Sequence, residues 1–174
     1  SADELIHDKD TGLKNERLTL IDNNGDGDYD VVHITNLFNI VVDEIYLSSG
    51  VISSKYSRGV YLDFYDNDIT YKLFMNGKEI GFTDLRGDDV ISLEETKDLG
   101  YRTIYAYVTR RAEVGIVSEI SDEYFIMNGA EYRFSQKANL SLNLLNLGGS
   151  AVLLMDCLGK VAAVNEKIDS RLRY

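Results

Sequence analysis

The chain has no proline and no tryptophan, and it has one cysteine and two histidines among its 174 residues. A single cysteine, Cys157, excludes an intrachain disulfide and a metal site built from several cysteines. No apolar run approaches the roughly 18 residues of a membrane span, so we expect no membrane insertion. The first residues, Ser1-Ala2-Asp3, include neither methionine nor the charged and apolar regions of a signal peptide. We therefore expect the sequence to be a piece of a longer protein.

Basic residues are also scarce relative to acidic ones. Lys and Arg number 18 and Asp and Glu number 29, which gives a formal net charge of −11. A field of that sign repels phosphate backbones, so we expect no nucleic-acid partner. Hydrophobic residues make up 44% and charged residues 27% of the chain, a composition typical of a folded protein with one ordinary domain or two small ones.

What remains is a pattern of short β-strands. Apolar and polar residues alternate in runs rich in β-branched and aromatic side chains, and Gly, Asn and Asp separate the runs. Asn76-Gly77 and Asn128-Gly129 favour tight hairpin turns, and Leu158-Gly159-Lys160 is typical of another hairpin tip. The pattern predicts an all-β fold, with short helices possible at Ala2–Asp8 and Asp169–Tyr174. The predicted strands are Arg17–Asp22, Tyr29–Thr35, Phe38–Leu47, Val60–Tyr65, Thr70–Met75, Val90–Glu94, Thr103–Thr109, Glu113–Ile120, Tyr124–Met127, Ala130–Phe134, Ala151–Asp156 and Val161–Asn165.

Three pairs of segments recur in the same order and indicate an internal duplication. They pair Val41–Ile45 with Ile116–Ile120, Asn76–Ile80 with Asn128–Tyr132, and Leu85–Ile91 with Leu147–Leu153. The alternative is that any all-β chain repeats Val, Gly and Asn-Gly by chance. A duplication predicts two small tandem β-barrel-like modules, with equivalent hairpins at the two Asn-Gly pairs. The expected domains are a first module at 15–110 and a shorter second module at 111–166, between terminal segments 1–14 and 167–174. No Pro- or Ser-rich linker separates the modules, so we expect them to share a continuous strand or a packed interface at a join near Thr109–Glu113.

The segment from Asp22 to Asp30 carries the clearest motif for a metal ion. Asp22, Asn24, Asp26 and Asp30 stand at positions 1, 3, 5 and 9 of a loop, and Asp28 is placed to offer its carbonyl at position 7. Such a spacing lets a looped backbone wrap oxygen ligands around Ca²⁺. Position 12 is a histidine and the flanks are strand-like, so the loop is not an EF-hand. The sequence leaves two readings open: a weak calcium site at a hairpin tip, or an Asx-rich turn that binds nothing.

The sequence contains no motif for a reaction. It has no nucleophile elbow, zinc-protease motif, phosphate-binding loop or dinucleotide fingerprint, so we predict no catalytic residues. Cys157 lies in an apolar strand, Leu153–Leu158, and is expected to be buried and unreactive. Acidic clusters at Asp63, Asp66 and Asp68 and at Asp84, Asp88 and Asp89 could supply the carboxylate pair of a glycosidase, but acidic residues are abundant throughout the chain.

Tyrosine is over-represented, with 12 Tyr against 6 Phe. Many of the tyrosines lie between Tyr56 and Tyr107. Tyrosine rings can line carbohydrate-binding or protein-binding surfaces, but they also suit half-buried strands in which the ring packs and the hydroxyl reaches water. We favour the second interpretation.

The order of these elements resembles the β-rich segment of Gram-positive Firmicute cell-surface proteins that also carry S-layer homology modules. The resemblance spans roughly residues 15–165, and no S-layer homology module is visible within the chain. It rests on the segments Leu18–Val32, Val41–Ile45, Lys72–Ile80, Leu85–Leu93, Gly115–Asp122 and Leu153–Val164.

The resemblance implies an extracellular setting in the S-layer or cell wall and a non-catalytic structural or binding role. Cell-wall polymer or other surface proteins are the implied partners, and calcium is the one possible cofactor. The alternative is a calcium-dependent carbohydrate-binding module or a fragment of a glycoside hydrolase.

Overall fold

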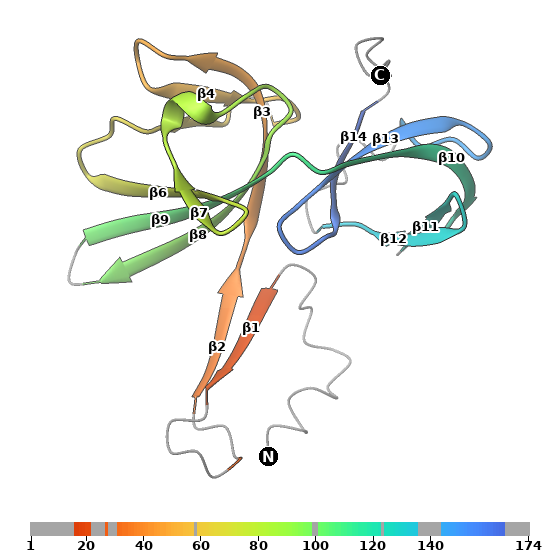
Figure 1. Cartoon of the computed structure of the whole chain (residues 1–174), viewed down its shortest axis with the longest axis horizontal. Coiled ribbons are helices and arrows are strands. Elements are labelled where there is room, and N and C mark those ends of the chain that lie inside the picture. Colours follow the sequence, from red (N-terminus) through yellow and green to blue (C-terminus); the bar gives the residue numbers. More distant parts are fainter. Residues whose placement is uncertain are drawn as a thin grey trace. The chain divides into compact units, whose positions relative to one another are not determined.

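The computed structural model describes residues 16–21, 27, 31–57, 59–98, 101–122, 124–135 and 144–165. These residues form 14 β-strands in three sheets and one short 3₁₀ helix, Phe82–Asp84, which confirms the predicted all-β class (Figure 1). The two predicted terminal helices lie outside the described residues. The chain divides into two compact units, residues 1–37 and residues 38–174.

The first unit contains a two-stranded antiparallel sheet. Strand β1 (Glu16–Ile21) pairs with β2 (Val31–Asn36), with Glu16 opposite Asn36 and Ile21 opposite Val31. Residues 22–30 connect these strands, which confirms the predicted hairpin connectivity. Of this connection the structure describes Gly27, whose φ of 92° lies in the region that favours glycine.

The larger sheet of the second unit has seven strands around one apolar core. Its neighbours are antiparallel except β6 and β9, which run parallel. Alternate residues of the strands face the core, as Ile40 and Val42 on β3 and Ile91 on β8 illustrate. In spatial order the strands are β5 (Tyr61–Asp63), β4 (Val51–Ser54), β3 (Phe38–Tyr46), β8 (Val90–Asp98), β9 (Tyr101–Thr109), β6 (Ile69–Met75) and β7 (Lys78–Ile80).

The smaller sheet of this unit has five antiparallel strands and its own core, centred on Phe125, Leu153 and Val164. The ring of Phe125 stacks on those of Tyr132 and Phe134, with centroids 5.6 and 5.0 Å away. In spatial order the strands are β12 (Ala130–Arg133), β11 (Tyr124–Met127), β10 (Ala112–Ile120), β13 (Ser150–Met155) and β14 (Val161–Asn165).

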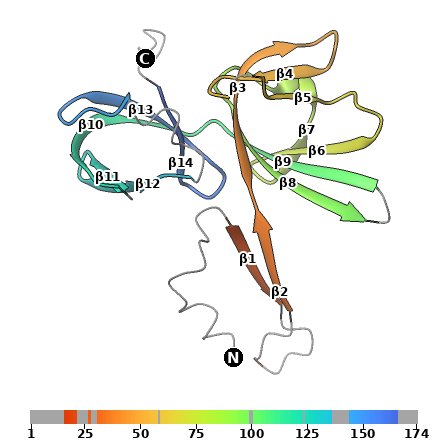
Figure 2. The same cartoon turned by 180° about the vertical axis from the view of Figure 1, so that it is seen from behind.

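Neither sheet closes into the barrel that the sequence suggested. Both sheets curl around their cores, yet among the described strands β5 does not pair with β7, and β12 does not pair with β14 (Figure 2). Strands β5 and β7 have only three residues each, which gives them few hydrogen-bonding groups with which to complete a ladder.

The chain passes from one sheet to the other between Thr109, where β9 ends, and Ala112, where β10 begins. As domain boundaries, the ranges 15–110 and 111–166 stay predictions.

An equivalent strand pairing repeats in the two sheets. The amide of Val42 donates to the carbonyl of Asp89 over 2.9 Å, and the amide of Asp88 donates to the carbonyl of Val42 over 2.9 Å. In the smaller sheet, Val117 makes the same two bonds with Gly149 and Gly148, over 3.0 and 2.7 Å. Asp88 and Gly148 both have positive φ, 67° and 76°. The predicted match between 41–45 and 116–120 therefore joins equivalent positions.

The strand order repeats as well. The run β5-β4-β3-β8-β9 of the larger sheet corresponds to β12-β11-β10-β13-β14 of the smaller one, and β3 and β10 each carry a register shift after the equivalent valine. In the smaller sheet Phe134 makes an isolated parallel bridge to Val161 of β14. This bridge is equivalent in position to the parallel pairing of β6 with β9 in the larger sheet. The structure thus supports the duplication at the level of topology.

The two Asn-Gly turns are nevertheless not equivalent, so that part of the prediction is wrong. Asn76-Gly77 joins β6 to β7, a hairpin that the smaller sheet lacks among its described strands, whereas Asn128-Gly129 joins β11 to β12. All four residues have positive φ between 52° and 79°. The Asn-Gly pairs therefore predicted tight hairpin turns correctly, but they did not predict which strands of the duplicated sheets the turns connect. Leu85 likewise corresponds to the buried Leu145 rather than to the exposed Leu147.

Candidate functional site at the junction of the two sheets

The two sheets of the second unit meet through a small apolar cluster. Val41 and Val90 lie on the face of the larger sheet that points away from its core, and they pack against Leu154, Ala162 and Ala163 of the β13–β14 hairpin. All five side chains are less than 10% exposed. The alanines let the hairpin approach closely, and the burial of apolar surface favours the contact.

Hydrogen bonds surround this cluster. Asn39 Nδ2 donates to Asp156 Oδ2 over 3.0 Å, and the amide of Cys157 donates to Ser92 Oγ over 3.3 Å. The Thr109 hydroxyl donates to the Met155 carbonyl, and the Tyr56 hydroxyl donates to the Val164 carbonyl over 3.3 Å. Burial raises the pKa of the Tyr56 hydroxyl to about 12, with Asp88 and Asp43 adding to the rise. These four polar groups thus find partners across the seam, whereas the buried Asn39 Oδ1 has none among the described residues. The partners of these bonds are Asn39, Ser92, Thr109 and Tyr56 on one side and Met155, Asp156, Cys157 and Val164 on the other.

Asp156 shapes the tip of the β13–β14 hairpin. Its side chain is 4% exposed, and its Oδ1 accepts the backbone amides of Leu158 over 2.9 Å and Lys160 over 2.8 Å. The chain therefore leaves the strand after Met155 and enters a turn. Cys157 lies in this turn and is exposed, so the predicted buried cysteine is wrong. Strand β13 ends at Met155, two residues before Cys157, so the cysteine does not share the burial of the strand.

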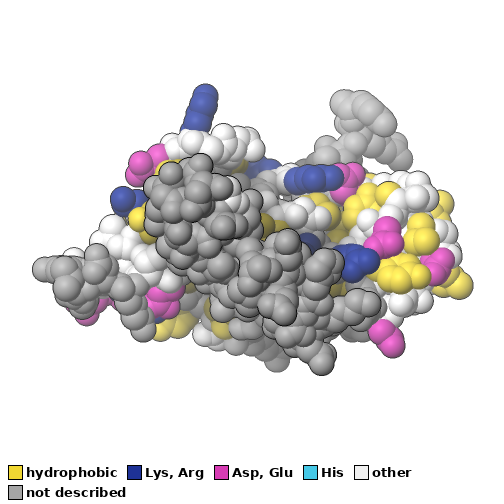
Figure 3. Space-filling model, turned by 90° about the horizontal axis from the view of Figure 1, so that it is seen from below, with side chains coloured by type: hydrophobic (Ala, Val, Ile, Leu, Met, Phe, Trp, Pro, Cys, Tyr) yellow, Lys and Arg dark blue, Asp and Glu magenta, His cyan; other side chains and the backbone are white. Residues whose placement is uncertain are grey.

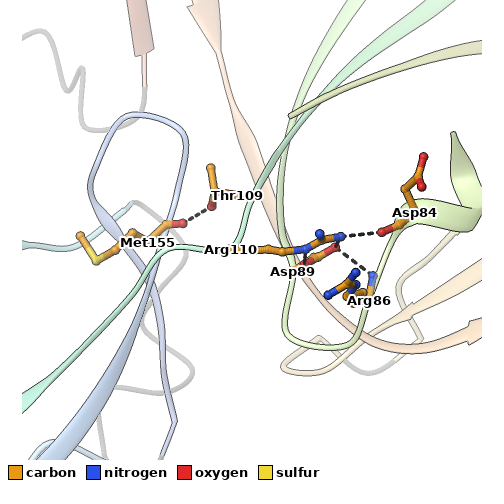
Figure 4. Close-up of polar contacts among 6 residues, drawn as sticks. All are labelled: Asp84, Arg86, Asp89, Thr109, Arg110 and Met155. Carbon is orange, nitrogen blue, oxygen red and sulfur yellow. Dashed lines mark hydrogen bonds and ion pairs between the residues drawn. The ribbon is translucent and has the colours of Figure 1, made fainter. Parts of the chain in front are cut away.

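An ion pair with a buried carboxylate fixes the chain where it leaves the larger sheet (Figure 4). Arg110 Nε and Nη2 donate to the two carboxylate oxygens of Asp89 over 2.7 and 3.1 Å, and Nη2 also donates to the Asp84 carbonyl. Asp89 Oδ2 further accepts the amide of Arg86 over 2.9 Å. The hydrogen bond to Asp89 raises the pKa of the Arg110 guanidinium. The two-pronged geometry makes this a directional, charge-assisted contact.

A cavity of about 490 Å³ lies beside this pair. Arg110 is bound to Asp89, and Arg111 Nε donates to Glu113 Oε1 over 3.0 Å, so both guanidinium groups have carboxylate partners. The described lining includes a thiol but no histidine that could act as its base. Its residues are Met75, Asn76, Thr109, Arg110, Arg111, Asp156, Cys157 and Gly159.

The predicted calcium ligands Asp22, Asn24, Asp26, Asp28 and Asp30 lie outside the described residues. Within the described ranges, no group of three or more His, Cys, Asp or Glu side chains is placed to hold a metal ion.

The other acidic clusters make structural contacts. Asp63 Oδ1 accepts the amide of Tyr65, and Asp66 Oδ1 accepts that of Asp68, each over 2.9 Å. Asp84 Oδ2 accepts the amide of Gly81 over 2.9 Å, and Asp88 pairs with Lys55 over 2.5 Å. These contacts are typical of turns and strand ends.

The described tyrosines between Tyr46 and Tyr107 divide into two groups. Tyr56, Tyr71, Tyr105 and Tyr107 are half-buried in or beside the larger sheet, as the preferred interpretation expects. Tyr46, Tyr61 and Tyr65 are more exposed, at 46%, 64% and 59%. The Tyr65 ring lies directly over Gly50, where an added Cβ would come within 2.5 Å of it. Glycine at position 50 therefore makes room for that ring.

Hydrophobic side chains also reach the surface of the smaller sheet. Val114, Ile116 and Ile120 of β10 are 45%, 59% and 44% exposed. One view of this part of the molecule shows yellow hydrophobic side chains interspersed with acidic ones (Figure 3, right).

Comparisons of the chain with protein-family models, with curated proteins and with solved structures give no match. The resemblance to S-layer-associated proteins therefore stays a prediction. In the part of the chain that the structure describes, no helix is long and apolar enough to cross a membrane.

Proposed function

We propose that this chain is a non-catalytic structural module of a Gram-positive cell-surface protein, associated with the S-layer or cell wall. It acts as a stiff spacer that presents neighbouring parts of the protein at a set distance. The observation that carries the proposal is the seam between the sheets, where an apolar cluster, hydrogen bonds and a two-residue connection join two copies of one β topology. A spacer needs such a joint, since two sheets linked by a flexible connection would bend freely.

The setting rests on the sequence resemblance and on the composition. An acidic chain with a single cysteine needs no disulfide framework, and its charge keeps it soluble beside other surface components. Cell-wall polymer or another surface protein would be its contact. Protease treatment of intact source cells tests this setting: peptides of this chain should be released from the surface, and recovery only from lysed cells would oppose it.

Stiffness is tested by backbone ¹⁵N relaxation on the full chain. The amides of the seven-stranded and five-stranded sheets should report one common rotational correlation time. Leu154→Asp, which places a charge in the seam, should give the sheets two different correlation times. Leu158→Asp, a change at a turn residue that is 37% exposed, is the matched control and should leave a single value. Two correlation times in the unaltered chain would contradict the spacer proposal.

The second candidate is a calcium-dependent carbohydrate-binding module. Its support is the exposure of Tyr61 and Tyr65 together with the Asp-rich segment 22–30. Aromatic side chains present the apolar faces on which sugars pack. A site without a bidentate carboxylate at position 12 should bind calcium with a Kd of about 10⁻⁴–10⁻³ M.

Thermal melts in millimolar Ca²⁺ and in chelator, repeated on Asp22→Ala plus Asp26→Ala, test the ion. A calcium-dependent rise in Tm that the double variant loses would support this candidate. Equal melting temperatures in calcium and in chelator would show that residues 22–30 are only an Asp-rich turn. Calcium-dependent retention on cell-wall glycans, lost in Tyr61→Ala, would then favour carbohydrate binding over the spacer role.

A further inference from the structure

The outward face of strand β10 carries two exposed apolar side chains. Val114 and Ile116 alternate with Gly115 and the fully buried Val117, so they point away from the core of the five-stranded sheet. Their exposed fractions are 45% and 59%. Apolar side chains that are neighbours on one sheet face and open to solvent often mark a contact surface.

The duplication shows what covers this position in the other sheet. Ile116 precedes Val117 as Val41 precedes Val42, and these two valines make the equivalent backbone hydrogen bonds. Val41 is only 5% exposed, because Leu154, Ala162 and Ala163 of the β13–β14 hairpin pack over it. The face around Val41 in the larger sheet is therefore covered, whereas the equivalent face around Ile116 in the smaller sheet is open to solvent.

The part that would cover the open face can be identified by the same correspondence. Strand β8 corresponds to β13, with Val90 equivalent to Ser150 and Glu94 equivalent to Leu154. The cross-strand pair Glu94–Tyr105 of the β8–β9 hairpin is therefore equivalent to the pair Leu154–Ala163 of the β13–β14 hairpin. The β13–β14 hairpin already packs on Val41 of its own chain. A second copy of the chain can offer its β8–β9 hairpin instead.

The β8–β9 face combines aromatic rings with charged groups, and the Tyr107 hydroxyl donates to Glu94 Oε2 over 2.9 Å. The Tyr105 ring stacks near that of Phe74, with centroids 6.4 Å apart, and Lys72 Nζ lies 5.7 Å from the Tyr105 centroid. Tyr105 is half-buried, and tyrosine is enriched in protein interfaces because a rigid ring gives apolar contact while its hydroxyl stays wet.

We propose that the Val114–Ile116 face of one copy docks against the Glu94–Tyr105 face of a second copy. The contact is head-to-tail: each copy uses two different surfaces, so the association repeats and produces chains rather than a closed symmetric dimer. A net charge of −11 on each copy opposes association at low ionic strength, and salt screens this repulsion. The proposal does not depend on the proposed function.

Disulfide trapping tests the geometry. In a Cys157→Ser background, Ile116→Cys combined with Glu94→Cys should give a ladder of oxidised oligomers, because the equivalent positions Val41 and Leu154 belong to one packed cluster. Leu47→Cys combined with Glu94→Cys is the matched control, since Leu47 is also 59% exposed but lies in a turn. The control should stay monomeric. Efficient dimerisation of Ile116→Cys alone would overturn the proposal, because it would indicate that the face pairs with itself.

Sedimentation equilibrium tests the association without a cross-link. The unaltered chain should show a mass that rises with concentration in 0.5 M salt, and Val114→Thr plus Ile116→Thr should weaken that association about tenfold or more. Leu47→Thr should leave it unchanged. A monomeric mass of the unaltered chain at millimolar concentration would overturn the proposal, as would equal association of the double variant and the unaltered chain.

Discussion

Replacing Arg110 by methionine should destabilise the protein more than removing its partner, Asp89. The Asp89 side chain is 2% exposed and that of Arg110 is 31% exposed. Arg110→Met keeps an apolar stem but removes the two hydrogen bonds that Arg110 donates to Asp89. The buried carboxylate then keeps the hydrogen bond from the Arg86 amide. Breaking a buried pair in this way costs about 3–5 kcal/mol, and partial access of water through the space left by Arg110 places the expected loss near the lower end, about 3 kcal/mol.

Asp89→Gly should cost less, about 1–2 kcal/mol, for two reasons. The guanidinium left behind can reach water, so no buried charge remains uncompensated. The turn itself does not need the carboxylate, because Gly149 occupies the equivalent position and makes the same backbone hydrogen bonds. The combined variant should be little less stable than Asp89→Gly alone, so the double-mutant cycle should give a coupling energy of about 3 kcal/mol.

Urea denaturation at pH 7 measures the three losses. The slope of unfolding free energy against urea should stay constant across the variants, since the folded core is unchanged. A loss below about 1 kcal/mol for Arg110→Met, or additive losses in the cycle, would show that solvent rather than the ion pair satisfies Asp89.

Three other changes test separate parts of the structure. Gly115→Ala should cost about 1–3 kcal/mol in urea denaturation, because its Cβ would come within 2.4 Å of Asn128 Nδ2, while Gly81→Ala, whose nearest contact is 3.5 Å, should cost less; equal losses would contradict the packing. The raised pKa of Tyr56, about 12, means that the unfolded chain loses this proton first, so its contribution to stability is intact below pH 10 and is lost as the pH rises from 10 towards 12. Tyr56→Phe should make that alkaline loss of unfolding free energy shallower, and an unchanged pH profile would refute the assignment. Cys157 should react with a thiol reagent in the native state, and labelling that needs denaturant would show that it is covered.

The strand class and the hairpins could be predicted because they depend on local chemistry. Alternation of apolar residues located β3, β6 and β11, and the Asn-Gly pairs adopt positive φ at both positions as that dipeptide favours. Two short strands, β4 (Val51–Ser54) and β7 (Lys78–Ile80), were not among the predicted strands.

The sequence predicted a join near Thr109–Glu113 with a continuous strand or a packed interface, but not the residues that make the contact, although one signal of them was present. Residues 151–155 and 161–164 are unbroken apolar runs, and the structure buries both faces of β13 and β14. One face belongs to the core of the smaller sheet and the other contacts the larger sheet. Continuous apolar strands indicate burial on two sides, but they do not name the partner. Asn39, Asp89 and Arg110 are polar residues far apart in sequence, so nothing local distinguished them from surface residues.

The same reasoning explains why the repeat was found but aligned incorrectly. An Asn-Gly turn can serve any tight hairpin, so its recurrence carries no information about which strands it joins. The bonds that define the repeat are long-range, from Val42 to Asp88 and Asp89 and from Val117 to Gly148 and Gly149.

At equivalent positions the two copies differ where their surroundings differ. Asp89 and Gly149 occupy equivalent turn positions, and Asp89 has a carboxylate with which Arg110 forms an ion pair. Val41 and Ile116 are both apolar, yet one is covered and the other exposed. The exposed isoleucine at position 116 is the feature that the head-to-tail contact explains.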